Sequence, residues 1–158
     1  MIKIKKSKTA DTRYVAVSAA CDFSQVTKKQ LLHSSKQHIS DVMDGMRFFM
    51  DELLDSSLCH DHDKLDDIDQ FHADFITGFK KTGWWDNHRK ITRHHLLADD
   101  GVPEDVNLID VLEMIVDCVM AGMGRTGTVY PLEIKPEVLM NAFQNTVELL
   151  KTQIIVED

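Results

Sequence analysis

Residues 107–120, NLIDVLEMIVDCVM, are the stretch that decides the fold. Asn107 is one of the residue types preferred at the position just before a helix. The residues after it place apolar side chains on nearly every side of the helix they would form. Because a helix that is apolar almost all round is normally central in a fold, this stretch predicts a buried helix in an all-α protein.

Three carboxylates interrupt this apolar helix. At about 100° per residue, Asp110, Glu113 and Asp117 project from the same face. If that face points into the protein, the carboxylates need a counter-charge or a metal ion, because a buried charge without a partner is costly. The alternative interpretation is that the acidic stripe is the solvated side of the helix.

Further helices are predicted on both sides of this one. Thr27-Lys-Lys-Gln30 has the pattern of a capping box, and the helix that it starts is expected to fray near residues 55–57. The other helices predicted from apolar spacing cover residues 65–79, 84–97 and 136–150. Residues 1–24 carry short β-like pieces and are expected to form an extended arm. The sequence thus predicts this arm and a single helical domain over residues 25–158.

The composition excludes several classes of partner. The chain has 158 residues, with 18 Lys plus Arg against 26 Asp plus Glu and a formal net charge of −8. Such an acidic chain is poorly suited to duplex nucleic acid, whose phosphates require basic contacts. Three cysteines without CxxC spacing favour a reducing compartment. With neither a signal-peptide pattern nor an apolar run long enough for a membrane helix, we expect a cytoplasmic protein that has no membrane partner and can form a homo-oligomer.

The residues that point to chemistry are His60-Asp61-His62-Asp63-Lys64. Imidazole and carboxylate groups are both ligands of divalent metal ions. With His38 upstream and Asp117 downstream, they give the order His…His-Asp…Asp, which is the ligand set of a helical metal site that activates water. Six of the eight histidines fall within residues 60–95, namely His60, His62, His72, His88, His94 and His95.

Each of these signals also has a simpler interpretation. A single histidine such as His38 at the edge of an apolar stripe is more often structural. The acidic residues at 61 and 63 could favour the positive end of a helix dipole. Trp84 and Trp85 could be core residues. The ordered set of ligands on three separate helical segments is what favours the metal site over these alternatives.

The same order of residues resembles the HD-domain superfamily of metal-dependent phosphohydrolases, whose core is a bundle of about five helices. A closer resemblance is to small phage-encoded HD-like proteins and extends over roughly residues 8–125. It is carried by TADTR (9–13), LLHSSKQHISDV (31–42), HDHDK (60–64), WWDNHRKITRHHL (84–96) and NLIDVLEMIVDC (107–118). The resemblance implies an HD-like bundle of about five to six helices, and a host cytoplasm as the location if the chain is phage-encoded.

The HD pattern implies that His38, His60, Asp61 and Asp117 bind one divalent metal ion. HD proteins with additional histidines can hold a second ion, and His88, His94 and His95 are the residues available for it here. Asp63 leaves open whether His62-Asp63 is the operative pair, although we favour His60-Asp61 because it places Lys64 three residues beyond the aspartate, as in the phage relatives. The ion itself is expected to be Mn, Mg, Co, Fe, Zn or Ni, with one or two per chain.

The function expected from this site is hydrolysis of a nucleotide or related phosphoester by metal-activated water. Lys64, Arg13 and one of His94 and His95 are candidates to stabilise charge on the phosphoryl oxygens, and a histidine there could protonate the leaving oxygen. Trp85 could stack on a base. Two alternatives remain, a di-iron oxygenase of HD-like fold and a non-catalytic, metal-stabilised phage protein that binds a host protein.

Overall fold

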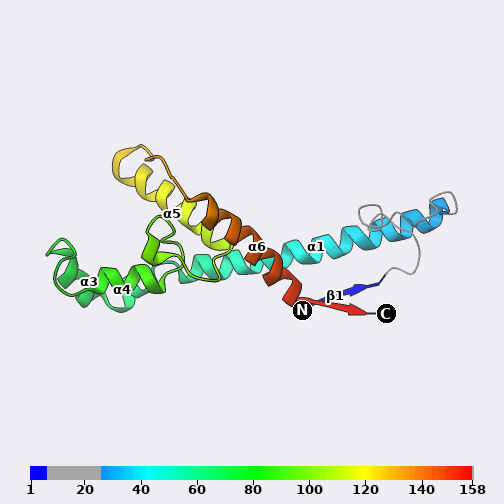
Figure 1. The fold of residues 1–158 in the computed structure, drawn as a ribbon, viewed down its shortest axis with the longest axis horizontal. Helices are drawn as coiled ribbons and strands as arrows, with labels where there is room; N and C mark the ends of the chain where they lie inside the picture. Colours follow the sequence, from blue (N-terminus) through cyan, green and yellow to red (C-terminus); the bar gives the residue numbers. More distant parts are fainter. Residues whose placement is uncertain (7–25, 158) are drawn as a thin grey trace. The chain divides into compact units, whose positions relative to one another are not determined.

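The computed structural model of the protein describes residues 1–6 and 26–157, and the chain there is mostly helical (Figure 1). The helices, in chain order, are α1 (Lys28–Cys59), α2 (His62–Asp66), α3 (Ile68–Phe75), α4 (Trp84–Ile91), the 3-10 helix η2 (Asp99–Gly101), α5 (Leu108–Thr126) and α6 (Pro136–Thr152). The strands are β1 (Ile2–Lys5) and β2 (Ile154–Glu157). The all-α prediction is confirmed. None of the helices in this part of the chain combines the length and the apolar character needed to span a membrane.

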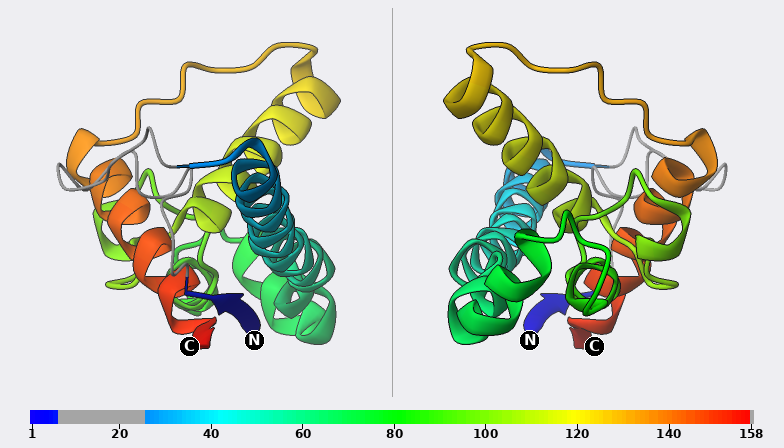
Figure 2. Two further views of the ribbon diagram at one scale, coloured as in Figure 1. Left: turned by 90° about the vertical axis from the view of Figure 1, so that its right-hand side faces the viewer. Right: turned by 90° about the vertical axis from the view of Figure 1, so that its left-hand side faces the viewer.

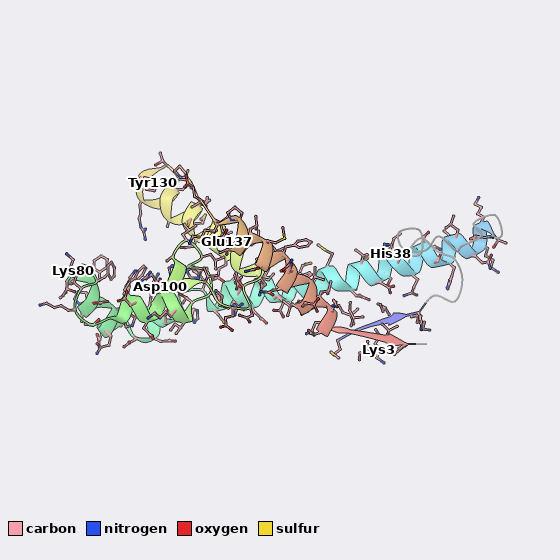
Figure 3. All side chains as sticks on the ribbon, viewed as in Figure 1. Lys3, His38, Lys80, Asp100, Tyr130 and Glu137 are labelled. Carbon is pink, nitrogen blue, oxygen red and sulfur yellow. The ribbon has the colours of Figure 1, made fainter. Side chains whose placement is uncertain are left out.

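The chain forms two compact units. One consists of Met1–Asp51 together with Leu149–Asp158, and the other of Glu52–Glu148. The first unit contains the two strands, which run parallel with Ile2 opposite Ile154, and Lys3 forms an ion pair with Glu157 at 2.9 Å (Figures 2 and 3). Residues 2–5 of the predicted arm are thus a strand, and the rest of the arm from residue 7 onward lies outside the described residues. The predicted limits of a single domain at residues 25–158 stay a prediction.

Two helix starts agree with the capping patterns in the sequence. Before α1, the Thr27 N–H donates to Gln30 Oε1 at 2.9 Å and the Gln30 N–H donates to Thr27 Oγ1 at 3.2 Å. Before α5, the Asn107 side chain accepts from the Ile109 N–H at 2.8 Å, while the Asn107 N–H donates to Asp110 Oδ2 at 2.8 Å. Each arrangement satisfies N–H groups that have no partner inside the helix.

The core of the second unit forms where α5 meets α6 and the loop before α5. Its buried side chains are Leu96, Val106, Val111, Met114, Val138 and Ala142. The Leu108 N–H donates to Thr146 Oγ1 at 2.8 Å, and Asn145 Nδ2 donates to the Val106 carbonyl at 2.9 Å. These bonds attach the start of α5 to α6 and fix which face of α5 is buried.

Asp110, the first residue of the acidic stripe, is buried and paired with Arg93. Arg93 Nε lies 2.8 Å from Asp110 Oδ1, and Nη2 lies 2.9 Å from Oδ2. The carboxylate raises the pKa of the Arg93 guanidinium above its ordinary value. A two-point ion pair of this kind satisfies a buried carboxylate and fixes the orientation of both groups. It therefore holds the segment before Leu96 against the first turn of α5.

Two predicted helices are shorter than the apolar spacing indicates. The helix predicted over 65–79 is divided between α2 and α3, because Asp67 departs from helical geometry at φ −123° and ψ 42°. The helix predicted over 84–97 ends at Ile91, because Thr92 is extended and its hydroxyl donates to the His88 carbonyl at 2.6 Å. In contrast, α1 continues through residues 55–57, where the Ser56 hydroxyl donates to Glu113 Oε2 at 2.6 Å.

Asp74 joins the end of α3 to the start of α4. Its side chain is fully buried and accepts from the backbone N–H groups of Thr82 and Trp85, each at 3.0 Å, and of Lys81 at 3.4 Å. A carboxylate that accepts several backbone N–H bonds is favoured in its charged form. Asp74 thus closes the loop between the helices, which lie side by side (Figure 1).

We predict that Asp74→Asn lowers the melting temperature at neutral pH. Hydrogen bonds from the backbone, that of Trp85 first, lower the pKa of Asp74 below 3.8. Because the folded-state pKa is the lower one, the charged carboxylate stabilises the fold above pH 3.8, and this contribution is lost as the pH falls through the folded-state pKa. Circular dichroism melting curves of both proteins should therefore converge in acid. A difference in melting temperature that is independent of pH would contradict this account.

Candidate metal centre

The sharp junction between α1 and α2 presents two neighbouring side chains to the same region. α1 ends at Cys59 and α2 begins at His62, and Asp61 between them has left-handed backbone angles of φ 54° and ψ 20°. A residue other than glycine in this conformation costs roughly 1–3 kcal/mol and is found most often at functional sites. Aspartate is among the residues that tolerate it. The turn allows His60 and Asp61 to project into one cluster.

One set of donor atoms in this cluster is rich in histidine. Asp61, His88, His94 and His95, which we name the histidine group, can together surround one ion. Asp61 Oδ1 lies 3.4 Å from His88 Nε2 and 3.5 Å from His94 Nε2. His95 Nε2 lies 2.9 Å from His88 Nε2. Donors bound at about 2.0–2.1 Å to one metal ion stand roughly 2.8–3.4 Å from one another, so these separations are close to those of shared coordination.

The second oxygen of Asp61 belongs to another set. His60, Asp61 and Asp117, which we name the carboxylate group, can also surround one ion. His60 Nε2 lies 3.5 Å from Asp61 Oδ2 and 3.8 Å from Asp117 Oδ1. The two groups therefore share Asp61, one through Oδ1 and the other through Oδ2.

Carboxylates outside these two groups orient the histidines. His60 Nδ1 is hydrogen-bonded to Glu113 Oε1 at 2.8 Å, and His88 Nδ1 is hydrogen-bonded to Asp63 Oδ2 at 2.7 Å. His94 Nδ1 lies 2.9 Å from the same Glu113 oxygen, although not at the angle of a hydrogen bond. In each ring Nδ1 faces a carboxylate and Nε2 faces Asp61. Metal-binding histidines commonly have this arrangement, because the carboxylate fixes the tautomer and the ring orientation.

The charges in the cluster compensate one another. Burial raises the pKa of Asp61, but the ammonium of Lys64 outweighs it and holds that pKa below its ordinary value. Burial likewise raises the pKa of Glu113, yet contacts with His94, Ser56 and His60 lower it to about 2. Burial lowers the pKa of His94, but the Glu113 carboxylate outweighs it and raises that pKa. Burial, with the charges of His94 and His88, lowers the pKa of His95 to about 4. At neutral pH both carboxylates are charged, while His95 is neutral and has a lone pair available.

The cluster fits a metal ion by a further criterion. Asp61 Oδ1 and His94 Nε2 are buried and have no hydrogen-bond partner, although they lie 3.5 Å apart and face each other. Buried polar atoms without partners are rare in native proteins and often indicate an ion or a water. Asp61 Oδ2 is paired with the Lys64 ammonium. The imidazoles of His88 and His94 and the carboxylate of Asp61 offer ligand atoms within 4.8 Å of one another, and first-row divalent metals prefer such donors. These groups can therefore hold a metal ion.

Aromatic rings fix the position of His88 on α4. Its ring stacks on Trp84 at 5.1 Å between centroids with an interplanar angle of 11°, and on Trp85 at 5.0 Å with an angle of 29°. The Trp85 ring also meets His95 edge-on at 5.5 Å. Both indoles thus contact residues of the histidine group.

The turn that carries His94 and His95 is held from both sides. Arg93 pairs with Asp110 at the start of α5, as described above. On the other side, Gly101 lies so close that a Cβ atom there would stand 2.5 Å from the His95 carbonyl oxygen and 3.1 Å from His95 Cβ. Gly101 is thus required for close packing beneath this turn.

The structure brings together six of the residues predicted for the site. They are His60, Asp61, His88, His94, His95 and Asp117. His38 belongs to the other compact unit and to none of the candidate groups among the described residues, so its role as a ligand stays a prediction (Figure 3). His62 is exposed, whereas Asp63 contacts His88, so the geometry favours His60-Asp61 as the ligand pair.

The remaining residues predicted for the site are Lys64, Trp85 and Arg13. Lys64 forms an ion pair with Asp61, and its ammonium lies 5.5 Å from the centroid of the Trp85 ring. Trp85 packs on His88, and its role in binding a base stays a prediction. Arg13 lies outside the described residues. Sequence reasoning did not identify Glu113 as a partner of the histidines, although its spacing of four residues from Asp117 on the acidic face was the available signal.

Comparison of the chain with protein-family models, with curated proteins and with solved structures found no match.

We predict that Gly101→Ala destabilises the second unit, because the new methyl group must displace the backbone at His95. Overpacking of this kind costs about 1–3 kcal/mol. The matched control is Gly124→Ala on α5, where a Cβ atom meets nothing within 4 Å and alanine favours the helix. In chemical denaturation, Gly101→Ala should unfold at lower denaturant concentration than the parent, and Gly124→Ala at an equal or higher one. Equal midpoints for the parent and Gly101→Ala would disprove the close packing at this turn.

Proposed function

We propose that this protein is a metal-dependent phosphohydrolase that binds two divalent ions through a shared aspartate. The observation that carries the proposal is the position of the two Asp61 oxygens. Oδ1 faces the histidine group, and Oδ2 faces the carboxylate group. Two-metal sites of this type are common among phosphatases and nucleases. The resemblance of the His60-Asp61…Asp117 order to HD-domain phosphohydrolases supports the same assignment.

The two groups differ in the ions they would prefer. The histidine group offers three imidazoles and one carboxylate oxygen, which suit Zn, Co, Ni or Fe. The carboxylate group offers one imidazole and two carboxylates, which suit Mn or Mg as well as Fe. When bound, such ions lower the pKa of water and neutralise charge on a phosphoryl group.

The protein's own residues would hold and orient the reactants. Glu113 and Asp63 keep the Nε2 atoms of His60 and His88 directed toward Asp61. Lys64, which neutralises Asp61 Oδ2 here, would bind a phosphoryl oxygen at the edge of the cluster. The Trp85 and Phe71 rings lie 5.5 and 6.0 Å from its ammonium and limit where that ammonium can move. His95, neutral at pH 7, has a lone pair available to bind an ion of the histidine group.

The proposal predicts the number of ions that each variant binds. Titration calorimetry with Mn²⁺ and Zn²⁺ should find two sites in the parent. Asp61→Asn should weaken both sites, and asparagine retains tolerance of the left-handed backbone there. His88→Ala and Asp117→Asn should each weaken one site. His62→Ala is the matched control, because this exposed neighbour should leave both sites unchanged.

The same proteins test catalysis. The metal-loaded parent should release inorganic phosphate from a panel of nucleotides and aryl phosphates, and Asp61→Asn should reduce the rate at least about 100-fold. His62→Ala should retain the parental rate. Two bound ions with no turnover of any phosphoester would refute the hydrolase and leave a metal-stabilised domain, while oxygen consumption by the iron-loaded protein would favour an oxygenase.

A further inference from the structure

An apolar groove lies between the end of α1 and the middle of α5. Its volume is about 310 Å³, and its apolar walls are formed by Leu53, Leu112, Val116 and Met120. All of these residues belong to the second compact unit. A volume of this size is at the lower end of the range for small-molecule sites, so the groove can seat a small organic group.

The groove is continuous with the candidate metal centre. His60 and Asp117, two of the three residues of the carboxylate group, are also lining residues, and so is Glu113 behind them. A molecule bound in the groove would therefore have one end beside His60 and Asp117. This contact distinguishes the groove from an apolar surface with no relation to the chemistry.

The charges around the groove determine which part of a substrate it can accept. None of the described residues that line it is Lys or Arg, and Glu113 and Asp117 are acidic. Its two serine hydroxyls are already engaged, that of Ser56 with Glu113 Oε2 and that of Ser57 with the Leu54 carbonyl. A second phosphoryl group would find no cationic side chain on these walls, and a polar base would find few partners. An apolar group of the substrate, in contrast, would gain free energy by leaving water for the apolar walls.

A second groove, of about 380 Å³, includes Asp61 in its lining and is less suitable for an apolar group. It is lined by the acidic residues Glu52 and Asp55 together with Asp61. Its one arginine, Arg93, is engaged with Asp110 and Asp105. Ile91 and Ile109 add apolar surface to this groove, but five acidic residues also line it and it offers no available cation.

We propose that the groove binds the organic part of the substrate, and that the substrate is a phosphoester with a single phosphoryl group and a largely apolar, ring-sized substituent. This inference rests on the proposed function, because the phosphoryl group is placed at the metal centre. It excludes nucleoside triphosphates as the preferred substrates, and it assigns Val116 and Leu112 to substrate selection and not to the chemical step.

Two phosphonates that resist hydrolysis test the proposal. Phenylphosphonate and methylphosphonate carry the same anionic head, and they differ only in the group that would enter the groove. Calorimetry with the Mn²⁺-loaded full chain should give phenylphosphonate at least about tenfold tighter binding, since apolar pockets commonly discriminate by that factor or more. Val116→Asn should remove most of this preference and leave the dissociation constant of methylphosphonate unchanged.

Val147→Asn on α6 is the matched control. Val116 and Val147 are both exposed helical valines, at 58% and 44%, and Val147 is not a lining residue of the groove. The control should keep the full preference for the phenyl compound. Melting temperatures of the three proteins show whether either substitution affects folding, and the comparison of the two phosphonates in the parent does not depend on any variant.

Other results would overturn the proposal. Equal binding of the two phosphonates by the parent, or equal weakening of both by Val116→Asn, would refute the groove assignment alone. Absence of phosphonate binding to protein that holds both ions would refute the phosphohydrolase and the inference together. A homodimer in light scattering that Val116→Asn dissociates would show that a second copy occupies the groove, which would also refute it.

Discussion

The carboxylate of Asp61 is the group on which the candidate site depends. Its two oxygens face different sets of donors. Its backbone has left-handed angles and lies just after the end of α1 at Cys59. If this residue adopted ordinary helical angles, α1 would continue into α2, and His60 and Asp61 would project about 100° apart from one straight helix. The cost of the left-handed conformation is offset by the contacts that surround it, of which the ion pair with Lys64 is the closest.

The rest of the second unit places histidines around this carboxylate and keeps them there. His60 arrives with Asp61, His88 comes from α4, and His94 with His95 comes from the turn after α4. Two of these segments are fixed by separate interactions. Asp74 closes the loop before α4, and Arg93 fixes the turn after α4 against α5. Such separate interactions are needed because the buried polar atoms of the cluster that lack hydrogen-bond partners do not stabilise the fold by themselves.

Helical periodicity in the sequence predicts part of this arrangement and fails where tertiary contacts decide. The start of α5 and the common face of Glu113 and Asp117 follow from local capping and from spacing, so both could be predicted. The end of α4 at Ile91 could not, because the residues up to 97 continue the helical pattern, and the chain leaves it to form the Arg93–Asp110 pair with a segment 17 residues away. His94 and His95 reach Asp61 only because of that departure. The role of Glu113 was hidden for the same reason, since its partners His60 and His94 lie on other segments.

α5 carries its acidic residues and its groove-lining apolar residues on two adjacent rows. Asp110 pairs with Arg93, Glu113 orients histidines, and Asp117 faces His60, all along one side of the helix. Leu112, Val116 and Met120 repeat at intervals of four residues and form the adjacent row, which lines the apolar groove. Because each of Leu112 and Val116 immediately precedes an acidic residue, the two rows stay about 100° apart along the helix. A substrate that bridges them would place an apolar group and a phosphoryl group on neighbouring faces of a single rigid element, so the distance between its two binding points is set by the helix and not by a loop.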